Sequence, residues 1–223
     1  VEHRYYVLSD PGITSAISAE MKDQKMLIAD GHHRYETALN YALENPDDPK
    51  KQYVLATLVP SDDEGLVIWP THRMVRSDNI SEKNIVKGFE SVLKTAEVSR
   101  EEMVAQLPDH MMGIVLKSGR CFLADPESEG DNGLLRLDTY VAQQKVLYGI
   151  FKSDEGKAEV SYDAEMDSAF EKMDSKKYEA AIILNDPSLD TIWELAMDGK
   201  RMPKKTTYFF PKIWSGFVLY SMH

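Results

Sequence analysis

The segment Asp30-Gly31-His32-His33-Arg34 combines residue types and spacing that suit phosphate chemistry. It lies between an apolar run at 26–29, expected to be a buried strand, and a helical pattern at about 33–43. The first N–H groups of a helix lack partners within the helix and carry partial positive charge, so they attract anions. The sequence therefore predicts a phosphate-binding turn at the start of this helix.

Each residue of the turn has a chemical role in this interpretation. Gly31 allows a ligand to approach the backbone, and the Arg34 guanidinium offers a planar fork that matches phosphate oxygens. His32 and His33 can donate imidazole hydrogen bonds. Asp30 can accept a proton from a substrate hydroxyl or bind Mg²⁺. The candidate catalytic residues are thus Asp30, His32 and His33, with Asp30 also the candidate metal ligand.

Two other interpretations of the turn compete with phosphate binding. In the first, Asp30 only caps the helix and the histidines happen to start it. Two histidines and an arginine in succession oppose the helix dipole, however, and this favours a bound anion. In the second, the histidines bind zinc. Neighbouring side chains on a helix point about 100° apart, so zinc ranks well below phosphate.

Two further motifs contain basic residues. Thr71-His72-Arg73 follows an expected strand at 66–70. It is interpreted either as part of the phosphate site or as a solvated loop. The stretch from Lys200 to Lys212 contains five basic residues and no acidic one. This favours a role in anion binding, and the alternative is an edge strand with a lysine-rich solvent face. We predict that phosphate or nucleotide contacts come from Gly31, His32, His33, Arg34, His72, Arg73, Lys204, Lys205 and Lys212.

Composition limits the class of protein. The formal net charge of −11 argues against a general nucleic-acid binder, which must neutralise phosphates. No apolar run is long enough to cross a bilayer, and the single cysteine, Cys121, fits a reducing compartment such as the cytoplasm. The chain starts within an expected strand at 1–8, which suggests that an N-terminal portion precedes it.

The pattern of the chain predicts a mixed α+β protein with a soft boundary near residue 76, which gives domains at 1–76 and 77–223. Helices are expected at about 11–22, 33–43, 81–94, 100–106, 138–149, 163–173 and 187–197. Strands are expected at 26–29, 53–59, 66–70, 113–116, 120–124, 180–184 and 213–220, with an acidic loop at 126–133.

Three motifs together resemble one family. Ile28–Ala38, Pro70–Arg73 and Met202–Lys212 resemble, in the same order, the uncharacterised bacterial and archaeal family numbered 1015 among domains of unknown function. The Asp30–Arg34 turn is also similar to the phosphate motif of the ParB/sulfiredoxin superfamily. That superfamily includes CTP-binding ParB, ATP-using sulfiredoxin and an archaeal ADP-dependent free-serine kinase, to which the turn is most similar.

The resemblance implies a ParB/sulfiredoxin-like N-terminal segment followed by an α+β portion. It implies phosphotransfer from ADP, ATP or another nucleotide, with Mg²⁺, to a small hydroxyl compound such as free serine. Two alternatives stay open: a nucleotide-binding regulator that binds without transfer, and a metal-dependent phosphoesterase that uses His32, His33 and His72. The expected partners are a nucleotide and a small hydroxyl substrate, with neither a membrane nor a nucleic acid.

Overall fold

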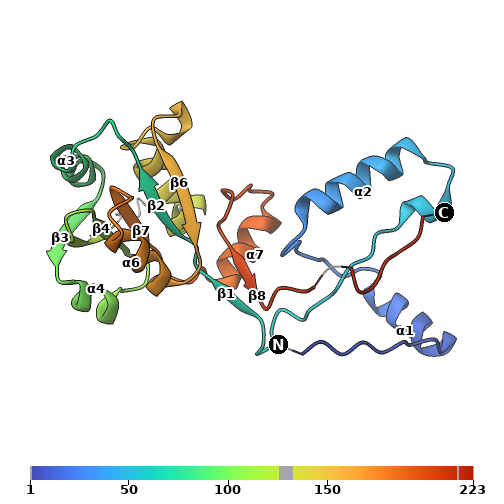
Figure 1. The fold of residues 1–223 in the computed structure, drawn as a ribbon. Helices are drawn as coiled ribbons and strands as arrows, with labels where there is room; N and C mark the ends of the chain where they lie inside the picture. Colours follow the sequence, from blue (N-terminus) through green and yellow to red (C-terminus); the bar gives the residue numbers. More distant parts are fainter. Residues whose placement is uncertain (1, 126–132, 215, 223) are drawn as a thin grey trace. The chain divides into compact units, whose positions relative to one another are not determined.

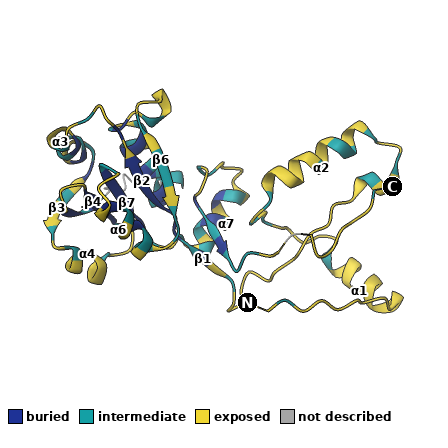
Figure 2. Cartoon of the chain, in the orientation of Figure 1, coloured by how far each residue is buried: buried dark blue, intermediate teal, exposed yellow. Residues whose placement is uncertain are grey.

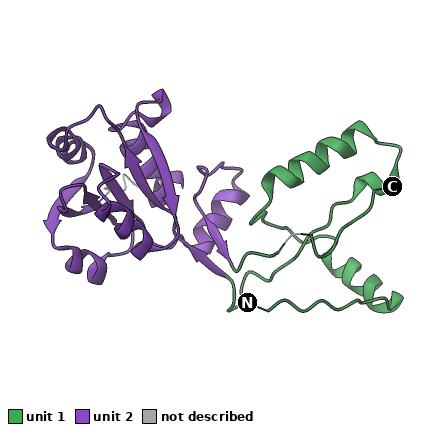
Figure 3. Ribbon diagram, in the orientation of Figure 1, with its two compact units in different colours: residues 1–66, 211–223 green, residues 67–210 purple. Residues whose placement is uncertain are grey.

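The computed structural model describes residues 2–125, 133–214 and 216–222. It divides into two compact units (Figure 3): unit 1 comprises residues 1–66 and 211–223, and unit 2 comprises residues 67–210. The α-helices (Figure 1) are α1 (Pro11–Met21), α2 (His32–Glu44), α3 (Glu82–Val92), α4 (Arg100–Gln106), α5 (Asp138–Val141), α6 (Met166–Asp174) and α7 (Leu189–Met197). The strands are β1 (Val67–Trp69), β2 (His72–Arg76), β3 (Lys94–Val98), β4 (Met112–Leu116), β5 (Cys121–Asp125), β6 (Glu159–Asp163), β7 (Ala180–Ile183) and β8 (Tyr208–Phe210).

Unit 2 is built around an antiparallel sheet with the strand order β3-β5-β4-β7-β2-β6. The central strands β4 and β7 are buried on both faces, and their sequences are nearly continuous apolar runs. The expected hairpin formed by β4 and β5 is confirmed, with Ile114 opposite Phe122. Helices α3 and α4 also agree with the expected positions.

Side chains that alternate along the strands supply two separate cores, because successive residues of a strand face opposite sides of the sheet. On one face, Ile114 and Ile182 pack with residues of α3 and of the helical segment that continues α5 (π-helical η3, Ala142–Tyr148). On the other face, Val115 and Ile183 pack with residues of α4 and α6. Unit 2 is therefore a three-layer α+β structure, and the expected mixed α+β class is confirmed.

A two-stranded antiparallel ladder joins β1 to β8 within unit 2. The Trp69 ring stacks on Phe210 with 4.4 Å between ring centroids, and on Tyr208 with 6.0 Å. The ladder thus brings the segment after residue 200 beside the segment that leads into β2, although the two are about 130 residues apart.

Unit 1 contains α1 and α2, neither of which has a buried residue (Figure 2). Asp10 caps α1 by accepting hydrogen bonds from the N–H groups of Gly12 and Ile13. The Tyr220 hydroxyl donates to the carbonyl oxygen of Lys50 at 2.9 Å, which ties the C-terminal segment to the short 3-10 helix η1 (Pro49–Gln52) that follows α2.

Four expected strands are wrong. Residues 26–29 and 53–59, and the described residues of 1–8 and of 213–220, form no strand. A strand needs a neighbour for its backbone N–H and C=O groups, and no strand pair among the described residues includes these segments. The expected acidic loop at 126–133 lies, except for residue 133, outside the described residues.

The domain limits 1–76 and 77–223 stay a prediction. Among the described residues, no helix has both the length and the apolar character that crossing a membrane requires.

Candidate functional site

The Asp30–Arg34 turn starts α2 in unit 1, as the sequence predicted. Gly31 is the N-cap residue with φ of 81°, a left-handed conformation that favours glycine. Its carbonyl oxygen accepts the N–H of Tyr35 at 3.0 Å, the first bond of the helix. Because glycine has no side chain, the N-cap residue of α2 offers no side-chain acceptor to the N–H groups at the start of the helix.

Two cations flank the carboxylate of the turn. Asp30 Oδ2 lies 3.8 Å from Arg34 Nη2 and 3.7 Å from Lys212 Nζ, and all three side chains are substantially exposed. The structure therefore brings Lys212, which is 182 residues away in the sequence, to the turn. The Arg34 side chain folds over Gly31 so closely that a Cβ on Gly31 would lie 2.8 Å from Arg34 Nη2.

The two histidines occupy the first turn of α2. His33 is 94% exposed, and its Nδ1 lies 3.4 Å from Glu36 Oε2. His32 is also exposed. Both rings therefore remain accessible to a ligand that approaches the start of the helix.

The motif Thr71-His72-Arg73 belongs to unit 2, and its alternative interpretation as a solvated loop is wrong. His72 and Arg73 open β2 and are 1% and 0% exposed. His72 Nδ1 accepts the N–H of Leu184 at 3.2 Å, so the neutral ring carries its proton on Nε2. Burial and the neighbouring Arg73 charge lower the pKa of His72 to about 4, so the ring is neutral near pH 7.

Arg73 connects the second motif to the third. Its guanidinium donates to the Thr71 carbonyl oxygen, and its Nη2 donates to the Lys205 carbonyl oxygen at 2.9 Å. Lys204 and Lys205 themselves are exposed on the turn before β8. The structure thus places Arg73, Lys204 and Lys205 together in unit 2, and Asp30, Arg34 and Lys212 together in unit 1.

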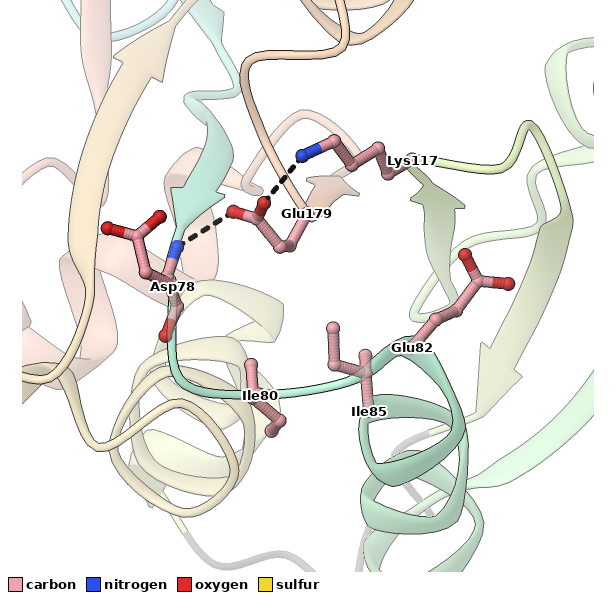
Figure 4. Close-up of a pocket in the computed structure, with 7 residues that line it drawn as sticks. Asp78, Ile80, Glu82, Ile85, Lys117 and Glu179 are labelled. Carbon is pink, nitrogen blue, oxygen red and sulfur yellow. Dashed lines mark hydrogen bonds and ion pairs between the residues drawn. The ribbon is translucent and has the colours of Figure 1, made fainter.

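Unit 2 also has two cavities that the sequence did not predict. The first, of about 350 Å³, is lined by Ser77, Asp78, Ile80, Glu82, Ile85, Lys117 and Glu179 (Figure 4). Glu179 accepts the Ser77 N–H at 2.7 Å and Lys117 Nζ at 2.9 Å. Its carboxylate is therefore used to join the end of β2 to the segments around β4 and β7.

The second cavity, of about 220 Å³, includes Asp109, His110, Arg136, Asp138 and Asp186 in its lining. Burial raises the pKa of Asp138 to about 6. The residues that line this second cavity come from segments far apart in the sequence, so no local motif predicted the cavity. Among the described residues, no group of three or more His, Cys, Asp or Glu side chains is arranged to hold a metal ion.

Comparisons with known proteins agree with this fold. Free serine kinase, solved as a variant in complex with AMP, has a TM-score of 0.55 at 18% identity, covering 91% of this chain and 81% of that one. A variant of the same kinase in complex with ADP has a TM-score of 0.53 at 18% identity and the same coverage. A conserved hypothetical protein from Pyrococcus furiosus has a TM-score of 0.51 at 16% identity, covering 81% of this chain and 68% of that one.

At these identities, the likeness establishes the fold alone. No curated protein matches the sequence. The family described as "Protein of unknown function (DUF1015)" matches residues 1–143, which is more than half of the chain. The predicted family is thereby confirmed, with the first two of the three motifs inside the matched residues, and the chain belongs to the DUF1015 family.

Proposed function

We propose that the chain is a nucleotide-dependent phosphotransferase that acts on a small hydroxyl compound, with the Asp30–Arg34 turn as its phosphate site. The observation that carries the proposal is the grouping of Asp30, Arg34 and Lys212 at a helix start whose N-cap residue, Gly31, has no side chain. Two full positive charges and about half a charge from the helix end face the Asp30 carboxylate, and the Glu36 carboxylate beside His33 is the second acidic group of the turn. The turn is therefore a positive centre in a protein with a net charge of −11.

The ion pairs at the turn are suited to exchange. Exposed pairs of this kind contribute only about 0–1 kcal/mol, so a phosphate group can recruit Arg34 and Lys212 from Asp30 at small cost. The released carboxylate of Asp30 then stands beside the bound phosphate. Its position suits a general base for an attacking hydroxyl group.

The transfer itself needs mainly positioning and charge neutralisation. The acceptor oxygen forms a bond to phosphorus, its proton passes to Asp30, and the bond from phosphorus to the nucleotide oxygen breaks. Arg34, Lys212 and the N–H groups at the start of α2 stabilise the charge on the phosphoryl oxygens. His32 and His33 are exposed donors at the same helix start.

Mg²⁺ suits this donor set, because it binds through one or two carboxylates together with phosphate oxygens and water. Asp30 would be its protein ligand, and the ion would neutralise phosphate charge. The fold of this chain is similar to that of free serine kinase in complex with AMP and with ADP, which supports a nucleotide as donor and a serine-like hydroxyl compound as acceptor.

Turnover separates this proposal from a regulator that only binds. Purified protein is incubated with ADP or ATP, Mg²⁺ and a panel of hydroxyl amino acids, and phosphorylated product is followed by ³¹P NMR. We expect Asp30→Asn to lower turnover at least a hundredfold, and Lys212→Met to weaken nucleotide binding by about 1–3 kcal/mol.

Asp47→Asn is the matched control, because it removes the same charge from an exposed residue just beyond the other end of α2. Nucleotide binding without product in any arm would favour the regulator. Equal loss in Asp30→Asn and Asp47→Asn would show that only overall charge matters.

A further inference from the structure

The turn Pro203–Thr206 in unit 2 has a defined and strained backbone. Lys205 has φ of 61°, a conformation that lysine rarely adopts. The Thr206 hydroxyl donates to the Pro203 carbonyl oxygen at 2.8 Å and lies 3.4 Å from the Thr139 hydroxyl. Thr206 is buried, whereas Lys204 and Lys205 are exposed. The Thr206 hydroxyl thus holds the turn, which presents the side chains of two consecutive lysines to solvent.

Arg73 is buried beside this turn and contacts its backbone, and no carboxylate among the described residues is paired with its charge. The side chain is 0% exposed, and its guanidinium reaches two main-chain carbonyl oxygens and lies 5.9 Å from the centre of the Tyr162 ring. Among the described residues, neither Arg73 Nε nor the buried Thr71 hydroxyl has a hydrogen-bond partner. Neutral acceptors compensate a buried cation only in part, because a buried charge normally requires a counter-charge.

No carboxylate within the described part of the chain forms an ion pair with Arg73, Lys204 or Lys205. Burial lowers the pKa of Arg73 to about 10, which still leaves it protonated near pH 7. Arg73 and the two lysines of the turn therefore carry three positive charges without an acidic partner among the described residues, in a chain with 37 acidic residues and 26 Lys and Arg residues. Such a concentration attracts anions, and the low dielectric around Arg73 strengthens its field at the turn.

We infer that the Pro203–Thr206 turn is a binding site for a phosphate-type oxyanion. Lys204 and Lys205 contact the anion, and Arg73 acts through the turn as a positioning residue that also supplies a fixed positive field. The site lies within unit 2 and uses none of the residues of the Asp30–Arg34 turn. It therefore stands independently of the proposed phosphotransfer.

The test uses the full chain labelled with ¹⁵N and titrated with pyrophosphate. We expect amide resonances of residues 204–206 to shift on binding. The double variant Lys204→Gln/Lys205→Gln should bind pyrophosphate at this turn at least tenfold more weakly. Parallel titrations with inorganic phosphate and with ADP show whether the free anion or the nucleotide is the better ligand.

The control is a second lysine pair in unit 2, Lys176 and Lys177. Both are exposed, and Lys176 also has positive φ, 59°, but no buried arginine is hydrogen-bonded to their backbone among the described residues. Lys176→Gln/Lys177→Gln should leave the affinity within twofold of the wild type. Equal weakening in the two double variants, or full binding without Lys204 and Lys205, would overturn the inference.

Two replacements of Arg73 test its positioning role. Arg73→Lys and Arg73→Met both lose the guanidinium contacts to two carbonyl oxygens, but only Met loses the charge. We expect the lysine variant to bind pyrophosphate at least threefold more tightly than the methionine variant, whereas a purely structural role predicts equal affinity. If neither variant folds, the two lysine pairs still decide whether the turn binds the anion.

Arg34→Gln separates this site from the proposed function. It should leave the shifts at residues 204–206 unchanged even where it lowers nucleotide turnover. Loss of those shifts in Arg34→Gln would contradict a separate site in unit 2.

Discussion

Replacing Gly31 with alanine tests the geometry of the phosphate turn. Gly31 has φ of 81°, and a side chain in the left-handed region costs about 1–2 kcal/mol. The added Cβ would lie 2.8 Å from Arg34 Nη2 and 2.9 Å from Arg34 Nε. Because the end of an arginine side chain is flexible, we expect the guanidinium to swing away from Asp30 rather than the backbone to move.

The loss of a guanidinium from the site has a predictable size. One charge-assisted hydrogen bond contributes about 1.5–3 kcal/mol, so the affinity for ADP should fall by about 10- to 150-fold. Affinity is measured by calorimetric titration with Mg²⁺, and stability by urea unfolding followed by circular dichroism. Arg34→Gln should cause a similar loss, and Gly31→Ala/Arg34→Gln little more, since both changes remove the same contact.

Gly156 provides the control for backbone strain. Its φ is 72°, and a Cβ there would meet no atom within 4 Å. Gly156→Ala should therefore lose a similar 1–2 kcal/mol of stability, by the order of magnitude of left-handed strain, without any loss of ADP affinity. If Gly31→Ala binds ADP as tightly as the wild type while it shows the same strain as Gly156→Ala, Arg34 does not hold the phosphate.

Three further predictions concern stability in unit 2. The folded pKa of His72, about 4, lies below its ordinary value of 6.5, so the unfolded chain binds more protons and stability is lost as the pH falls from about 6.5 to 4. In His72→Gln, the free energy of unfolding should no longer fall by roughly 3 kcal/mol between pH 6.5 and pH 4, as measured by urea unfolding. The same pH dependence in the variant and the wild type would count against this role of His72. Burial raises the pKa of Asp138 to about 6, so its effect on the pH dependence of stability is opposite: the stability that it contributes is lost as the pH rises from about 4 to 6. Asp138→Asn should therefore be more stable than the wild type at pH 8 by about 1–3 kcal/mol. A less stable variant at pH 8 would contradict this prediction. Gly113→Ala should destabilise by about 1–3 kcal/mol, since its Cβ would lie 2.7 Å from Met103 Sδ in the core, and Met103→Leu/Gly113→Ala tests whether that sulfur is the obstacle.

The sequence predicted the parts of the fold that have a clear local pattern. β4, β5 and β7 are apolar runs, and α2, α3 and α4 have clear helical periodicity or caps, such as the Ser99–Glu102 capping box. The strands β3 and β6 were missed because they form the two edges of the sheet and carry many polar residues. The apolar run at 53–59 was mistaken for a strand, because an apolar run does not reveal whether a partner strand exists.

The candidate site shows a similar limit. The position of Gly31 at the start of α2 follows from local sequence, but the approach of Lys212 to Asp30 does not. For Thr71-His72-Arg73, the polar composition suggested an exposed segment, but the three residues are buried. The structure buries it because β2 is an inner strand, flanked by β7 and β6. Burial of such a strand is decided by its neighbours rather than by its own residues.

The segment from Pro203 to Lys212 supplies basic residues to both positive centres, the Asp30–Arg34 turn and the Pro203–Thr206 turn. In unit 1 it supplies Lys212 to Asp30, and in unit 2 it supplies the carbonyl oxygen of Lys205 to Arg73 together with two exposed ammonium groups. A chain with a net charge of −11 repels anions at long range, so any phosphate site must be made positive locally. Since acidic residues are absent from 200–212, this segment can raise the local potential in each unit without adding a competing carboxylate. Under both proposals the role of this segment is therefore electrostatic, and each proposal stands even if the other centre binds no phosphate.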